Sequence, residues 1–250
     1  IKAAFVSFPK APSPQDEATT ESEIRSLSQE VRSGGDFDAI ARQNSDDPGS
    51  AQRGGDLGFF GRGRMVKAFE DSAFSLAPGT VSEPFLTRFG WHIVKVEERK
   101  GEGDSLQVRA RHILLTVQPG RATLDSIRMR VEEFVEATEE KGFDAVAAQF
   151  GLQTQETGYI APGAFFPFLG NKTAGFVNGF LAADPGTVER RETEQGLYVF
   201  SLREKRPAGP RPFAEVEGRI LSTLRREKKV ALAADRIQPV LDLVRSGKTL

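Results

Sequence analysis

The sequence predicts an α+β fold, with two tandem units that each consist of a small antiparallel sheet surrounded by helices, followed by a long C-terminal helix. Three observations lead to this prediction. Four blocks of sequence occur twice in the same order. Each copy has few strand-like runs, with helical segments between them and no regular βαβ alternation. The last part of the chain carries one long helical stripe of apolar residues.

The repeat defines the expected domain organisation. Its paired blocks lie 106 or 107 residues apart. The pairs are Ile1–Phe8 with Gln107–Leu115, Asp36–Gln43 with Gly142–Gln149, Phe74–Val81 with Leu181–Val188, and Phe89–Lys100 with Gln195–Arg206. The Gly-rich polar run "KGEGDS" (Lys100–Ser105) is interpreted as the linker between the copies. We therefore expect a first domain over residues 1–100 and a second over residues 106–206.

The elements of the first unit follow from periodicity, caps and turn residues. They are a strand at Lys2–Phe8, a helix with Ile24, Leu27 and Val31 on one face, a short helix at Phe37–Gln43 with Asp36 as its N-cap, a glycine-rich loop at Asp46–Gly63, a helix at Val66–Ser75, and strands at Glu83–Thr87 and Trp91–Glu97 joined by a turn at Arg88–Gly90. The first long helix of the second unit carries Ile127, Val131, Phe134 and Val135 on one face.

A third region, residues 212–250, is predicted to be a long helix. It follows the stiff linker "RPAGPRP" (Arg206–Pro212). Its apolar stripe includes Val216, Ile220, Leu224, Ala231, Ala234, Ile237, Leu241 and Val244. Pro239 is expected to kink or break the helix. The stripe needs a partner, and the candidates are an N-terminal segment, a second copy or a client, so a dimer or intramolecular packing is open.

Composition excludes several classes of function. The net charge is −1, without the basic excess of a nucleic-acid binder, and "RREKK" (Arg225–Lys229) is interpreted as a solvated helix face. No apolar run is long enough to span a membrane. The chain begins in a strand without Met, so we interpret it as an excised fragment whose membrane attachment would use a segment absent from it. The absence of Cys excludes disulfides and a thiol nucleophile.

One long ordered motif in the first unit resembles the parvulin family of peptidyl-prolyl isomerases. It comprises "GGDLGFF" (Gly54–Phe60), "GRM" (Gly63–Met65), "AFEDSAFSL" (Ala68–Leu76) and "PGTVSEPFLTRFGWHIV" (Pro78–Val94). The resemblance is specific over residues 1–98 and weak over residues 107–206. With the trailing helix, two such parvulin-like units resemble bacterial extracytoplasmic folding factors of the PpiD and SurA type. In those proteins the isomerase unit sits inside a helical chaperone module.

The resemblance implies a site without cofactor or metal. Leu57, Met65 and Phe69 take the positions of the proline pocket, with Phe89 on its frame. Asp47 takes the polar position near the carbonyl, and Thr87 and His92 lie on the closing strands. Such a site needs an apolar cup for the ring and polar groups that favour the twisted amide. The alternative for the apolar residues is an ordinary core, and for Asp47 a turn before Pro48.

The two histidines are predicted to lie in different sites. The family carries a second histidine on its first strand, where the first unit has Phe5, so a weakened activity is expected. The second unit has His112 in that place, but Tyr198 stands where His92 would be. Each copy thus retains one half of the pair. Strand exchange between the units would join the halves, and the repeat register argues against it. An imidazole separation below about 4 Å would contradict this prediction.

The implied function is prolyl isomerisation and folding of unfolded or exported polypeptides, outside the cytoplasm. The second unit would be a degenerate copy that binds clients or builds scaffold. Its run "FFPF" (Phe165–Phe168) could fill the cleft or offer an apolar surface. The alternative is a catalytically inactive chaperone or interaction module with the parvulin fold. A phosphoserine preference is not expected, because the first-strand loop "PKAPSPQ" (Pro9–Gln15) lacks an arginine cluster. A metal site is disfavoured, since the histidines lack a cluster of further ligands.

Overall fold

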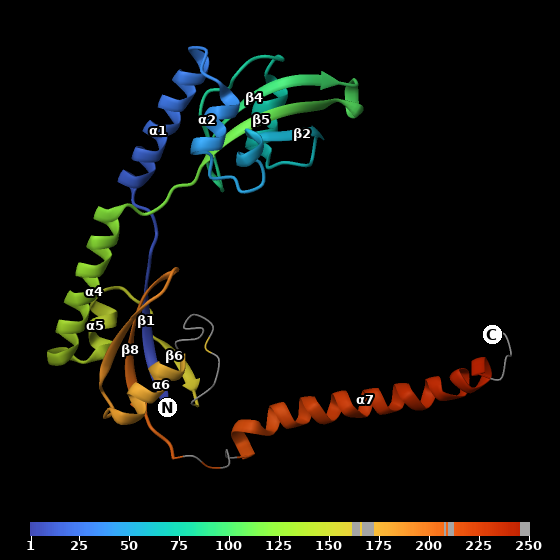
Figure 1. The fold of residues 1–250 in the computed structure, drawn as a ribbon. Coiled ribbons are helices and arrows are strands. Elements are labelled where there is room, and N and C mark those ends of the chain that lie inside the picture. Colours follow the sequence, from blue (N-terminus) through green and yellow to red (C-terminus); the bar gives the residue numbers. More distant parts are fainter. Residues whose placement is uncertain (162–165, 167–172, 208, 210–212, 246–250) are drawn as a thin grey trace. The chain divides into compact units, whose positions relative to one another are not determined.

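A computed structural model describes residues 1–161, 166, 173–207, 209 and 213–245. The chain divides into two units, Ile1–Glu204 and Lys205–Leu250. Helices and antiparallel strands make up the first unit, and the second contains one long helix (Figure 1). The α+β class with antiparallel sheets is confirmed. The structure therefore agrees with the predicted fold class. The pairing of the strands determines which segments of the chain form each sheet.

The described residues of the first unit form two four-stranded antiparallel sheets. The first sheet has the strand order β2-β5-β4-β3, and the second sheet has the order β6-β1-β8-β7. The strands are β1 (Lys2–Pro9), β2 (Asp56–Gly61), β3 (Phe85–Thr87), β4 (Gly90–Lys100), β5 (Gln107–Leu115), β6 (Gln155–Tyr159), β7 (Val188–Glu192) and β8 (Gly196–Glu204).

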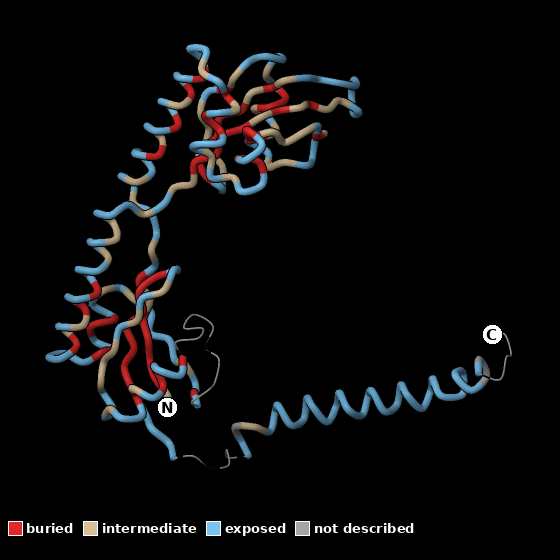
Figure 2. Tube along the Cα trace, viewed as in Figure 1, coloured by how far each residue is buried: buried red, intermediate tan, exposed pale blue. Residues whose placement is uncertain are grey.

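Helices cover both faces of each sheet. Those of the first sheet are α1 (Pro14–Arg32), α2 (Phe37–Asn44) and α3 (Lys67–Ser75), and those of the second are α4 (Arg121–Lys141), α5 (Phe143–Gln149) and α6 (Thr173–Ala182). In the first sheet, α1 and α2 bury one face and α3 the other. In the second sheet, α4 and α5 bury one face and α6 the other. The buried positions follow the strands and the inner faces of these helices (Figure 2).

The prediction that each copy keeps its own first strand is wrong. The strand β1 lies in the second sheet between β6 and β8, and β5 lies in the first sheet between β2 and β4. The first strands of the repeat are therefore exchanged. The register is preserved, because His112 faces Val94 in the first sheet and its repeat counterpart Phe5 faces Phe200 in the second.

The run Lys100–Ser105 is the physical reason for this correction. It does not separate the sheets. Gly101 and Gly103 adopt positive φ angles of 79° and 55°, and they close a hairpin between β4 and β5. Since residues 101–106 are all that separates these strands, their pairing costs little loop entropy. A short glycine-rich run between two apolar strands is a hairpin signal, and it outweighs the repeat register.

The remaining elements lie near their predicted positions. The Asp36 side chain caps α2 by accepting from the backbone N–H of Asp38 at 3.0 Å, as expected. The loop predicted at Asp46–Gly63 contains the strand β2, which the sequence analysis missed because glycines interrupt its alternation. In this loop Gly54 and Gly55 adopt positive φ angles, 64° and 76°.

The C-terminal unit contains the predicted helix, α7 (Phe213–Arg245). It continues through Pro239, so the expectation of a break there is wrong. Proline removes one backbone hydrogen bond, which a long helix can lose without ending. Ile220, Leu224, Ile237 and Leu241 are exposed. Residues 208, 210–212 and 246–250, in the predicted linker and at the end of region 212–250, lie outside the described residues.

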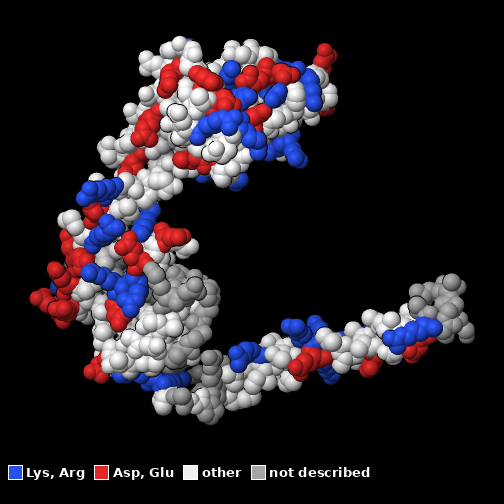
Figure 3. Space-filling model, viewed as in Figure 1, with Lys and Arg blue, Asp and Glu red and all other residues white. Residues whose placement is uncertain are grey.

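The surface carries no strong excess of either charge. Lys and Arg are interspersed with Asp and Glu over the face that Figure 3 shows. This mixture agrees with the formal net charge of −1. None of the described helices is long and apolar enough to cross a membrane.

Candidate functional site

The first sheet brings both histidines into one hydrogen-bonded chain. The Nδ1 atoms of His92 and His112 lie 3.4 Å apart. His112 Nε2 lies 2.9 Å from Asp47 Oδ2 and 3.0 Å from Ser50 Oγ. At the other end, His92 Nε2 lies 2.9 Å from Thr87 Oγ1. The prediction that the histidines occupy separate sites is therefore wrong.

The sheet register explains this contact. His112 lies opposite Val94 on β4, and His92 lies opposite Leu114 on β5. The two imidazoles are thus diagonal neighbours on the same face of an antiparallel pair, within reach of each other. Their rings are 5.6 Å apart between centroids and nearly parallel, at 20°. The site depends on β5, because this strand supplies the second histidine.

A single arrangement of protons satisfies the whole chain. An ionised Asp47 only accepts, so His112 Nε2 donates to it. In a neutral imidazole the other nitrogen, His112 Nδ1, then accepts from His92 Nδ1. His92 Nε2 is left as an acceptor for the Thr87 hydroxyl. Thr87 Oγ1 in turn accepts from the backbone N–H of Phe89 at 3.1 Å.

The surroundings favour these protonation states. Burial lowers the pKa of His92 from 6.5 to about 4, and the neighbouring His112 adds to the effect. Burial also lowers the pKa of His112, against the opposing hydrogen bond to Asp47. Partial burial would raise the pKa of Asp47, but hydrogen bonds from Ser50, His112 and the Gly49 N–H outweigh it and lower this pKa to about 2. At neutral pH the site thus combines a carboxylate with two uncharged imidazoles.

An apolar pocket of about 410 Å³ opens beside this chain. Its lining residues are Asp46, Asp47, Pro48, Leu57, Met65, Val66, Phe69, Phe89, His92, His112, Leu114 and Thr116. Phe69 places its ring edge-on to both imidazoles, with centroids 5.4 and 5.5 Å away. Phe85 stacks on His92 at 5.5 Å. The volume falls in the range of small-ligand pockets.

The structure gathers all the predicted site residues. Leu57, Met65, Phe69, Phe89, Asp47 and His92 line the pocket, and Thr87 lies behind it, bonded to His92. His112 and Ser50 also belong to the site and were not among the predicted site residues. The signal for His112 was its place in the family's first-strand motif, which was assigned to the wrong unit. Ser50 offered no distinctive signal.

Gly55 allows the loop that carries Asp47 and Ser50 to lie against β5. The backbone N–H of His112 donates to the Gly55 carbonyl at 3.0 Å. A Cβ at Gly55 would come within 2.1 Å of the His112 carbonyl oxygen. The φ angle of 76° at this position also favours glycine. The glycines of "GGD" therefore bring the loop close to the strand that completes the site.

The second sheet has aromatic residues at the equivalent place. Phe5 and Tyr198 occupy the positions of His112 and His92, with centroids 6.4 Å apart. Phe166 packs edge-on against Phe5 at 6.3 Å. The rest of "FFPF" lies outside the described residues. Phe5 does not lie beside His92, so the reason for expecting a weakened site is wrong, although the rate itself stays untested.

Part of the chain is similar to known isomerase domains and folding factors. Residues 5–98 match the family model of the PPIC-type PPIase domain (rotamase). Chaperone SurA of Nitrosococcus oceani is 46% identical over 91 residues, which are 35% of this chain and 21% of that protein. Foldase protein PrsA of Geobacillus sp. (strain WCH70) is 40% identical over 121 residues, 48% of this chain and 42% of that protein.

These matches show that the chain resembles parvulin-type isomerase domains and the SurA-like folding factors. A crystal structure of the peptidylprolyl isomerase PrsA from Bacillus cereus aligns with 29% identity and a TM-score of 0.32, covering 60% of this chain and 48% of that one. The chain spans less than half the length of the curated relatives it matches.

No group of three or more His, Asp or Glu residues in the described part of the chain is arranged to hold a metal ion.

Proposed function

We propose that the first sheet and its helices form a peptidyl-prolyl cis-trans isomerase. The observation that carries this proposal is the pairing of an apolar pocket with the Asp47–His112–His92–Thr87 chain along one wall. The predicted roles follow from this arrangement. Leu57, Met65 and Phe69 hold the proline ring, Phe89 frames it, and Asp47 lies next to the reacting amide.

The site acts on the amide by electrostatics, without a covalent step. Rotation about an X–Pro bond meets a barrier of about 20 kcal/mol, because the planar amide is stabilised by resonance. Resonance puts partial negative charge on the carbonyl oxygen. The ionised Asp47 at the pocket rim disfavours that charge, and the apolar cup disfavours charge separation. Both effects raise the free energy of the planar amide relative to that of the twisted amide.

The neutral imidazoles hold Asp47 in place. His112 and Ser50 both contact its Oδ2 atom, and His92 and Thr87 fix the tautomer of His112. We assign Asp47 to the reacting amide, His92 to the pocket wall and the chain, and Thr87 to positioning His92. This assignment explains why imidazoles with depressed pKa values occupy a pocket that binds a neutral peptide.

We further propose that the two sheets are tandem parvulin-like units with exchanged first strands. The domain ranges 1–100 and 106–206 then hold except at their first strands. Residues 107–115 complete the isomerase unit and residues 2–9 complete the second unit, which is degenerate. The similar layout of helices on both sheets and the shared register support this proposal.

Unfolded polypeptides with X–Pro bonds are the proposed clients. The relatives named "Chaperone SurA" and "Foldase protein PrsA" support a folding role, and we place this role outside the cytoplasm. The exposed apolar residues of α7 suit packing against another polypeptide, and a dimer or intramolecular contact through α7 is part of the proposal.

Isomerisation of a proline peptide by the full chain tests this function. We expect acceleration by the native protein, and a fall in kcat/KM of about tenfold or more for Met65→Ala, since loss of pocket contacts costs about 1–3 kcal/mol in binding the transition state. Met129→Ala is the matched control, because Met129 is 64% exposed on α4. It should leave the rate unchanged.

The alternative function is an inactive chaperone with the parvulin fold. Absence of acceleration by folded protein would reject the isomerase and favour this alternative. Suppression of client aggregation by the same sample would then support it.

A further inference from the structure

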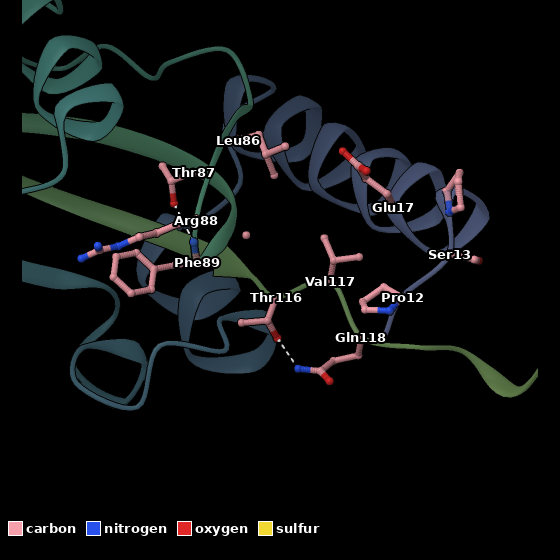
Figure 4. Close-up of a pocket in the computed structure, with 12 residues that line it drawn as sticks. Pro12, Ser13, Glu17, Leu86, Thr87, Arg88, Phe89, Thr116, Val117 and Gln118 are labelled. Carbon is pink, nitrogen blue, oxygen red and sulfur yellow. Dashed lines mark hydrogen bonds between the residues drawn. The ribbon is translucent and has the colours of Figure 1, made fainter. Parts of the chain in front are cut away.

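We propose that a second groove beside the proline pocket binds the extended stretch of client polypeptide that flanks the proline. This inference rests on the proposed isomerase function. The groove has a volume of about 630 Å³. Its walls come from the start of α1, the β3–β4 turn and the segment that follows β5. The lining residues are Pro12, Ser13, Pro14, Glu17, Leu86, Thr87, Arg88, Phe89, Gly90, Thr116, Val117 and Gln118 (Figure 4).

The groove is continuous with the proline pocket. Phe89 and Thr116 line both cavities. Thr87 lines the groove and hydrogen-bonds His92, which lines the pocket. A chain whose proline ring occupies the pocket therefore meets the groove with its neighbouring residues. Continuity with the proline pocket identifies the occupant as the same client polypeptide.

The walls of the groove suit apolar side chains on an uncharged segment. Leu86 is 44% exposed and Phe89 is 51% exposed, and Figure 4 shows Val117 and Pro12 across the opening from Phe89. A bound chain would cover this apolar surface. The charged lining residues are one acid, Glu17, and one base, Arg88. Because their charges balance, the groove offers no net attraction to a phosphorylated or highly charged segment.

The backbone of β3 adds a way to bind an extended chain. β3 is the last strand of the first sheet, and among the described strands it pairs only with β4. Leu86 lies in its middle. An edge strand can accept a further extended chain by main-chain hydrogen bonds, which do not depend on sequence. A client of varied sequence would be bound in this way.

A hydrogen-bonded clasp fixes the side of the groove formed by α1. The Asp16 carboxylate accepts from the backbone N–H groups of Ser13 at 2.7 Å and Gly120 at 3.0 Å. It also accepts from the Thr123 hydroxyl at 2.6 Å. The clasp joins the start of α1 to the chain after β5, which are the two places where the exchanged strands leave their sheets. The groove is therefore a consequence of the exchange.

Substrate length tests the inference in the full chain. We compare a blocked peptide of about four residues with one of about twelve that has the same centre and apolar flanks. Leu86→Glu and Val117→Glu should lower kcat/KM for the long peptide about tenfold, equivalent to about 1.4 kcal/mol, through a higher KM. The short peptide should be isomerised at the native rate. Met129→Glu, at an exposed site on α4, should change neither rate.

The outcomes separate this inference from the proposed function. Native isomerisation of both peptides, with no effect of either groove variant on the long one, would overturn the groove and leave the isomerase standing. No native activity on either peptide would overturn the isomerase. In that case the anisotropy of a labelled long peptide decides the groove: about tenfold weaker binding to Leu86→Glu supports it, and equal binding rejects it.

Discussion

His92 and His112 are buried, at 3% and 6% exposure, yet each ring nitrogen has a hydrogen-bonding neighbour. Buried polar groups that are all satisfied behave as a unit, because loss of one partner leaves the next one unpaired. The four side chains from Asp47 to Thr87 therefore act together. A change at Thr87 should therefore also affect the Asp47 carboxylate, which we propose lies next to the reacting amide.

Asp47→Asn tests the charge at this end. The asparagine side chain keeps the shape of Asp47. It lacks the negative charge that, in the proposed mechanism, disfavours the planar peptide bond. We expect kcat/KM for proline isomerisation to fall about tenfold to hundredfold, equivalent to about 1–3 kcal/mol. Asp71→Asn is the control, because Asp71 pairs with Lys67 on the exposed side of α3. Equal rates for the two variants would argue against a role for the Asp47 charge.

The depressed pKa of His92 predicts an unusual pH profile. Its neutral form accepts from Thr87 and persists until the pH falls to about 4. We therefore expect protonation of His92 to lower kcat/KM with a midpoint near pH 4, well below the ordinary range of histidine. Circular dichroism at each pH separates this loss from unfolding. A midpoint near 6.5, the ordinary pKa of histidine, would show that the imidazole is not buried as described.

The same shift predicts how stability changes with pH. The unfolded chain binds a proton at His92 near pH 6.5, whereas the folded chain resists protonation until about pH 4. Because the folded pKa is lowered, its contribution to stability is complete above pH 6.5. It is lost as the pH falls toward 4, by at most about 1.4 kcal/mol per pH unit for one group. Urea unfolding between pH 7 and pH 4 measures this slope.

At the scale of elements, the chemistry of each first strand matches the sheet that holds it. His112 on β5 meets Asp47, Ser50 and His92. Phe5 on β1 packs against Tyr198 and Phe200 at centroid distances of 6.4 and 5.5 Å. Returning each strand to its own copy would place the imidazole among aromatic rings and the phenyl ring beside a carboxylate. The free-energy cost of burying an imidazole without a hydrogen-bond partner opposes that arrangement.

Phe5→His distinguishes the two arrangements. If Phe5 lay beside His92, the substitution would complete the histidine pair and raise the isomerase rate. The exchanged structure predicts the same kcat/KM as the native chain, with lower stability, since an imidazole replaces a phenyl ring that is 5% exposed in the second core. Thermal unfolding and the peptide assay together measure this. A rate increase would contradict the exchange.

Much of the fold could be predicted from sequence, because helical periodicity, caps and turn residues act locally. The Asp36 cap and the helix from Val66 are examples. The pocket residues could also be predicted, because Leu57, Met65 and Phe69 belong to one long ordered motif. Which strand enters which sheet could not, because β1 and β5 are repeat counterparts and take the same register in their sheets. The hairpin at Gly101 and Gly103 decides between them.

For the whole molecule, the exchange makes the two sheets depend on each other. The first sheet lacks a histidine without residues 107–115, and the second lacks one of its two central strands without residues 2–9. The chain crosses twice between the sheets, near Asp16 and Gly120, where the clasp forms. The family match to residues 5–98 follows the order of the sequence, whereas the site is assembled from residues 45–116.

The isomerase rates of two fragments test this central claim most directly. Residues 10–120 contain β2, β3, β4 and β5 with all four members of the hydrogen-bonded chain, and we predict that they catalyse at a rate close to that of the full chain. Residues 1–100 contain Phe5 but not His112, and we predict that they do not accelerate isomerisation, whether or not they fold. Native-like activity of residues 1–100 would contradict the account, because it would show that the site is complete without β5.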